Sequence, residues 1–121
     1  MSAWRREAAA RLPELWRDED ARQSIYQFFF EALPFVVDAH RSGDEDALRR
    51  GYGFAAWCFQ QGGDLDNAAA VAFYEHLFDW WDVHEDVLRW LDRRIALECW
   101  SLFEARLDGE QLAFLRERLD I

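Results

Sequence analysis

The chain has 121 residues, of which 51% are hydrophobic and 17% are aromatic. This length fits one domain that buries about two-thirds of its unfolded surface in a single core. The formal net charge is −10, and all 14 basic residues are arginine. An acidic surface repels polyanions, so this charge argues against nonspecific binding of nucleic acid or anionic lipid and favours a basic protein partner. The same charge would also keep an aromatic-rich protein soluble without any partner.

The first third of the chain predicts a light helix, a short helix and a long core helix. Residues 3–11 have the alanine, glutamate and arginine content of a good helix former. Pro13 fits the first turn of a second helix that runs through Trp16. From 21 to 41, apolar residues recur every three or four positions and predict one buried face. That face carries Ile25, Phe28, Phe29, Ala32, Leu33, Val36, Val37 and His40. Pro34 should bend this helix without breaking the face.

The segment 44–61 predicts a second long core helix. Residues 42–44 supply a stop, a turn and an N-cap between the two long helices. Gly51 and Gly53 lower the helix propensity of this segment. Their presence therefore indicates the close approach of another helix.

The segment from Asp64 to Trp81 predicts a central helix around which the rest of the chain packs. On a helix, its apolar side chains cover about 200° of the circumference, twice the minimum stripe of a surface helix. Such a helix needs neighbours on two sides. The remaining strip carries Glu75, His76 and Asp79, so any function of this helix should lie there.

The last third predicts shorter helices that close the domain. Residues 83–91 form an amphipathic piece, Asp92 can cap the next helix, and Asp108-Gly109 marks the turn before the last one. No strand alternation of useful length occurs. We therefore predict an all-α single domain over residues 1–121, with six to seven helices around the central helix. The arrangement is an antiparallel bundle or a short stack of helical hairpins.

Two cysteines, Cys58 and Cys99, lie inside apolar helical patterns. We expect buried, reduced thiols, while a single disulfide between the two stays open. The sequence shows neither a signal peptide nor an apolar run long enough for a membrane span. The expected location is therefore cytoplasmic, with no membrane partner.

The sequence offers little for metal or catalytic chemistry. His76 and Asp79 have ligand spacing on a helix, and His40 and Asp44 have it only across a predicted turn. There is no Glu-x-x-His pair and no cysteine pair at ligand spacing. A Gly-x-Ser-x-Gly elbow and a phosphate-binding glycine loop are also missing. We expect no metal, no cofactor and no catalytic residue, so the predicted function is not enzymatic.

Acidic side chains concentrate between Asp64 and Asp92, where eight acids against one base give −7 of the total charge of −10. The adjacent Trp80 and Trp81 point about 100° apart on a helix, so at least one should be partly exposed. An acidic patch with such a ring suits a protein interface. The predicted interaction residues are Glu75, His76, Asp79, Trp81, Asp82, Glu85 and Asp86. The alternative is a solvated helix edge with both rings in the core.

The run FAAWCFQQGGDLDNAAAVAFYEHL, residues 54–77, resembles a family of small uncharacterised bacterial helical proteins. The centre of that family reads Asn-Ala/Leu-x-x-Val-x-Phe-x-Glu-x-Leu. The matching residues here are Asn67, Ala68, Val71, Phe73, Glu75 and Leu77. The resemblance covers about the middle half of the chain and implies no catalytic residues. The family that it points to is similar to families that contain immunity proteins of bacterial toxin systems.

Three hypotheses on function follow. The first is a bacterial, immunity-like or antitoxin-like domain that binds and neutralises a basic protein through the acidic surface. The second is a small-ligand or enzymatic domain with an aromatic pocket. The residues expected to line that pocket are Trp57, Tyr74, Trp80 and Trp100. The third is a structural domain that associates with itself as a homo-oligomer.

Overall fold

The computed structural model describes all residues from 1 to 121, and every regular element in it is a helix. The elements are α1 (Ala3–Arg11), α2 (Pro13–Trp16), α3 (Ile25–Ser42), α4 (Glu45–Gln61), α5 (Gly63–Ala72), η1 (Tyr74–His76), η2 (Trp81–Val83), α6 (His84–Trp90), α7 (Arg93–Glu98), α8 (Trp100–Arg106) and α9 (Gly109–Leu119). The all-α prediction is confirmed. The nine α-helices exceed the expected six to seven, in part because the helix expected after Asp92 is divided into α7 and α8.

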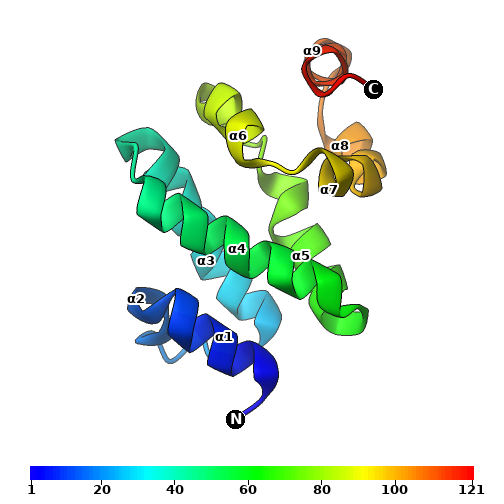
Figure 1. Cartoon of the computed structure of the whole chain (residues 1–121). Helices are drawn as coiled ribbons and strands as arrows, with labels where there is room; N and C mark the ends of the chain where they lie inside the picture. The colour runs from blue at the N-terminus through cyan, green and yellow to red at the C-terminus, as the bar shows by residue number, and fades with distance from the viewer.

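The N-terminal half is a bundle of α1, α3, α4 and α5 (Figure 1). Helices α3 and α4 form the predicted antiparallel hairpin. Gly43 ends α3 with a φ of 72°, and the Asp44 side chain accepts a hydrogen bond of 3.1 Å from the Ala47 N–H. Ser24 caps the start of α3 in the same way, accepting from the Gln27 N–H at 3.1 Å. Side-chain caps therefore set where both long helices begin.

Gly51 of α4 packs directly against Val36 of α3. A Cβ atom at this position would stand 2.5 Å from Cγ2 of Val36, which is closer than two carbon atoms can approach. At Gly53, a Cβ would stand 2.8 Å from Nη1 of Arg11 in α1. The predicted close approach of neighbouring helices at these glycines is confirmed.

The predicted continuous helix from 64 to 81 is wrong. Helix α5 ends at Ala72, Phe73 leaves helical geometry with φ −124° and ψ −71°, and two single-turn 3₁₀ helices follow. Phe73 and Tyr74 are both buried and meet edge to face with ring centroids 5.2 Å apart. Consecutive large rings point about 100° apart on a straight helix, and the break lets both enter the core. The apolar residues of 64–81 therefore cover a wide arc because the segment is a broken helix with protein on several sides.

The C-terminal half consists of the short helices α6 to α9, which lie beyond α5 when viewed from α1 (Figure 1). The helix expected after Asp92 is split at Cys99, another buried residue outside helical geometry. One hydrophobic cluster runs through both halves, so they share a core. None of the helices combines the length and the apolarity that a membrane span requires.

Both cysteines are free and buried, so no disulfide joins them. Burial raises the pKa of the Cys58 thiol to about 12 and that of the Cys99 thiol to about 12. The two thiols are therefore protonated at neutral pH and take the place of small apolar side chains in the core.

Candidate protein-interaction site

The predicted acidic residues between Glu75 and Asp86 are engaged in contacts within the chain. Three ion pairs join this segment to distant helices: Asp79–Arg106 at 2.7 Å, Asp82–Arg41 at 3.0 Å and Glu85–Arg118 at 2.6 Å. The hydrogen bond from Arg41 lowers the pKa of the Asp82 carboxyl. Much of the negative charge that the sequence places here is thus neutralised by arginines of α3, α8 and α9.

Asp86 is partly buried and belongs to a polar network that extends into the core. Its Oδ2 atom lies 2.7 Å from Nδ1 of His40, and Nε2 of His40 lies 2.7 Å from the Tyr52 hydroxyl. The carboxylate can only accept, so Nδ1–H of His40 donates to it, while Nε2 and the Tyr52 hydroxyl share the second hydrogen bond. Burial alone would raise the pKa of Asp86, but hydrogen bonds from His40 and Arg89 bring it below its ordinary value.

The network is enclosed by neighbouring side chains. Burial raises the pKa of the Tyr52 hydroxyl well above its ordinary value. Trp90 stacks on Tyr52 with ring centroids 6.0 Å apart and shields it further. The network therefore holds α3, α4 and α6 together.

The two adjacent tryptophans have different surroundings, and both are half-buried. Trp81 stacks on the His84 ring with centroids 4.0 Å apart and also meets Phe114 of α9 edge to face. Trp80 instead lines a groove on the surface. Trp81, which the sequence favoured as an interaction residue, lines a separate cavity with His84, Glu110, Gln111 and Phe114.

This groove lies between α3 and η1 and has a volume of about 230 Å³. Its lining is formed by Phe30, Leu33, Pro34, Ala72, His76 and Trp80. Phe30 is 54% exposed and is the only strongly exposed aromatic residue of the chain. We call this feature the Phe30 groove. It is the one cavity here whose lining is apolar except for a single histidine.

Carboxylates border the Phe30 groove. His76, which forms part of its wall, has Nε2 3.3 Å from Oε2 of Glu75 and Nδ1 2.8 Å from Oδ2 of Asp79. On the α3 side, Glu31 follows Phe30 directly, is exposed and has no ion-pair partner. The groove thus has an apolar floor with carboxylates close to it, of which Asp79 is also paired with Arg106.

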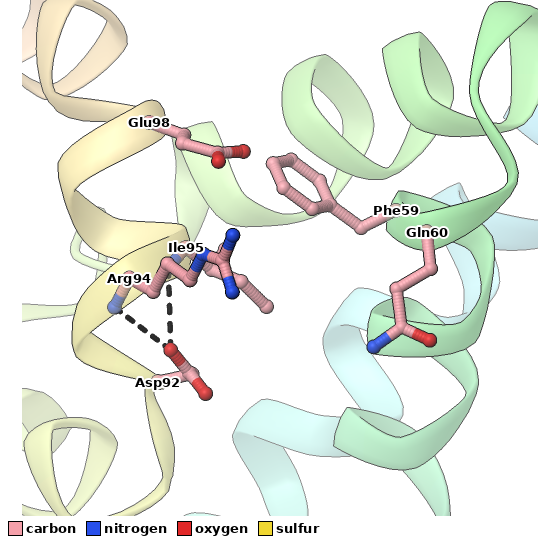
Figure 2. Close-up of a pocket in the computed structure, with 6 residues that line it drawn as sticks. All are labelled: Phe59, Gln60, Asp92, Arg94, Ile95 and Glu98. Carbon is pink, nitrogen blue, oxygen red and sulfur yellow. Dashed lines mark hydrogen bonds between the residues drawn. The ribbon is translucent and has the colours of Figure 1, made fainter.

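A second, polar cleft opens between the end of α4 and α7, and Figure 2 shows it. Its volume is about 360 Å³, and it is lined by Phe59, Gln60, Asp92, Arg94, Ile95 and Glu98. The predicted pocket of Trp57, Tyr74, Trp80 and Trp100 does not form. Tyr74 is only 1% exposed and packs edge to face on Phe59, so its ring fills the core in place of lining a cavity.

Comparison with known proteins identifies the family. A family model described as a domain of unknown function (DUF7674) matches residues 5–109. The chain belongs to this family. No curated protein and no solved structure matches the chain. Both the Phe30 groove and the polar cleft lie within the residues that define the DUF7674 match.

Two residues of these sites were missed by reasoning from the sequence. Phe30 could have been a candidate, because it is one of three aromatic residues of its segment, with Tyr26 and Phe35, that fall outside the repeat of three and four positions. No sequence pattern singles out Arg94, because what sets it apart from most other arginines is that its side chain has no partner in the folded structure.

Proposed function

We propose that this member of the DUF7674 family is a small acidic protein-binding domain that holds a basic protein at the Phe30 groove. The observation that carries the proposal is Phe30 itself, a large apolar ring 54% exposed beside an apolar groove. Together with the apolar groove this ring forms a contiguous apolar surface of the kind that marks interaction sites, and aromatic anchors supply much of the affinity of protein interfaces.

Charge indicates the chemistry of the occupant. Glu75 and Asp79 contact His76 of the groove wall, Asp79 being paired with Arg106 as well, and the exposed Glu31 follows Phe30 in α3, on a chain with a net charge of −10. A complementary partner segment presents one large apolar side chain for the groove, with arginine or lysine on either side of it. The apolar contact would provide affinity, while the opposite charges would accelerate association.

The biological setting that we propose is bacterial and cytoplasmic, with the domain acting as an immunity or antitoxin-like protein that covers a basic toxin. Support comes from the resemblance of residues 54–77 to small bacterial families of this kind and from the strong acidic excess. A domain of this type needs no catalytic residue, cofactor or metal, because neutralisation requires only a stable complex.

A second copy of the chain is the competing occupant of the groove. Two copies would each bring a charge of −10, so repulsion opposes their association at low salt. Sedimentation velocity at 50 mM and 500 mM salt should therefore find a monomer. A dimer that is lost on truncation of Phe30 would contradict the proposal and favour a self-associating domain.

Binding to the proteins encoded by the adjacent genes tests the function. We expect one of them to be basic and to form a complex whose dissociation constant rises by at least tenfold between 50 mM and 500 mM salt. Reversing the charge at the groove with Glu31→Arg should weaken this complex. The control Glu117→Arg, at an exposed acid of α9, should weaken it less. Absence of a complex with either protein, or equal effects of the two variants, would contradict the proposal.

A further inference from the structure

The polar cleft between α4 and α7 contains an arginine that the fold does not use. Twelve of the 14 arginines bind a carboxylate, a carbonyl or an aromatic ring within the chain, and only Arg17 and Arg94 do not. Arg17 lies on an exposed turn, whereas Arg94 lines the largest cleft of the molecule. In Figure 2 its guanidinium points from α7 toward α4.

The two carboxylates of the cleft differ in what they can bind. Oδ1 of Asp92 already accepts the N–H groups of Arg94 and Ile95, at 2.7 and 3.3 Å, as the N-cap of α7. Glu98, one turn after Arg94, makes no hydrogen bond with any other residue of the cleft and also points toward α4 (Figure 2). The cleft thus offers one free cation and one free anion about one helical turn apart.

The opposite wall supplies apolar and polar contacts. Phe59 is half-buried and forms its apolar part, and Gln60 lies beside Phe59 on α4 (Figure 2). Ile95, also half-buried, adds an apolar side chain from the α7 side. A volume of about 360 Å³ lies at the small end of the range for ligand pockets. The contents of the cleft must therefore be small.

Charge excludes the commonest class of small anionic ligands. The formal charge of Asp92, Arg94 and Glu98 together is −1, and the whole chain carries −10, so a phosphate or nucleotide is repelled. A planar guanidinium pairs best with a carboxylate, through two parallel hydrogen bonds. A free carboxylate beside it pairs with an ammonium group. Together these groups match a zwitterion with an apolar side chain.

We propose that the cleft is a binding site for a free α-amino acid with a large apolar side chain. Arg94 holds its carboxylate, Glu98 holds its ammonium group, and Phe59 and Ile95 pack on its side chain. The site is separate from the Phe30 groove, since the two cavities share no lining residue, and it stands or falls independently of partner binding.

A titration of the isotope-labelled full chain with L-phenylalanine, followed by amide NMR, tests the site. We expect a dissociation constant on the order of 1 mM, as is usual for a ligand of this size. The shifted amides should be those of residues 59–60 and 92–98. N-acetyl-L-phenylalanine lacks the ammonium group and L-phenylalaninamide lacks the carboxylate, so each should bind at least tenfold more weakly.

Matched variants assign the contacts. Arg94→Gln and Glu98→Gln should each weaken L-phenylalanine binding at least tenfold, whereas Arg17→Gln removes the other unpaired arginine and should leave it unchanged. All three positions are exposed, so the variants should keep the wild-type spectrum away from the cleft. No shift at 20 mM L-phenylalanine, equal binding of the three ligands, or equal binding by Arg94→Gln would overturn the proposal.

Discussion

His40 of α3 and Asp86 of α6 are 46 residues apart in the chain and share a hydrogen bond of 2.7 Å between Nδ1 and Oδ2. The His40 side chain has no exposed surface, and its second ring nitrogen meets the Tyr52 hydroxyl. This contact joins the C-terminal helices to the N-terminal bundle inside the core. Part of the acidic segment that the sequence marks as a surface is therefore structural.

The buried network should contribute far more to stability than the ion pairs beside it. His40→Leu leaves Asp86 and Tyr52 without their shared partner, and we expect it to lower the free energy of unfolding by about 2–4 kcal/mol. Arg41→Gln breaks an exposed pair with Asp82 one residue further on and should cost much less, because solvent screens this pair. Urea denaturation measures both values, and similar losses would show that the network has no special role.

Acid should weaken the fold through Asp86. Its pKa in the folded chain lies below the ordinary value of about 3.9, so the unfolded chain binds a proton first as the pH falls. The stabilisation is therefore present above about pH 4 and is lost as the pH drops through the folded pKa. Glu14 acts in the same direction, because the hydrogen bond from Arg50 lowers its pKa.

Urea midpoints at pH 7 and pH 3 test this linkage. Asp86→Asn should be less stable than the wild type at pH 7 and should lose less on acidification. Glu31→Gln removes an exposed acid without an ion-pair partner and should keep the wild-type loss. If Asp86→Asn lost as much stability as the wild type, Asp86 would not be the group responsible.

The close contact at Gly51 should make replacement of this glycine by alanine destabilising, although alanine is the better helix former. Alanine raises helix propensity by about 1 kcal/mol over glycine, but a Cβ here would meet Val36 at 2.5 Å. We expect Gly51→Ala to destabilise the chain by about 1–3 kcal/mol, as overpacking usually does. Gly109→Ala adds its Cβ in open space at the start of α9 and should be neutral or slightly stabilising. Thermal denaturation would contradict the packing argument if both variants gained stability.

The two thiols should be inert in the native chain. Cys58 and Cys99 are buried, and burial raises the pKa of each to about 12, so the reactive thiolate is scarce at pH 8. Labelling with Ellman's reagent should be slow for the folded chain and complete within minutes in 6 M guanidinium chloride. Rapid reaction of one thiol under native conditions would show that its surroundings open readily.

Much of the fold could be predicted from sequence because its signals are local. The caps Asp44 and Asp108 and the apolar repeats of α3 and α4 depend on neighbours within one or two turns. The break at Phe73 could not be predicted in this way. The break allows the consecutive rings of Phe73 and Tyr74 to be buried together, and Phe73 packs on Phe29, which is distant in the sequence. Such a partner is known only from the folded structure.

The candidate site was harder to predict than the fold. Composition identifies the acidic excess, but it does not show which carboxylates already have a partner. Asp82 and Glu85 are held by Arg41 and Arg118, which are more than 30 residues away in sequence. An unpaired group such as Arg94 can be recognised only once every other pairing is known.

The affinity of the partner for Phe30→Ala tests the central claim most directly. With the basic protein encoded next to this chain, isothermal titration calorimetry should show at least a tenfold weaker complex, because truncation removes the exposed anchor of the groove. Leu97→Ala shortens another exposed apolar side chain, which lines no cavity, and should change the affinity by less than twofold. Phe30 is exposed, so its truncation should leave the melting temperature nearly unchanged. If Phe30→Ala bound the partner as tightly as the wild type, the Phe30 groove would not be the docking site.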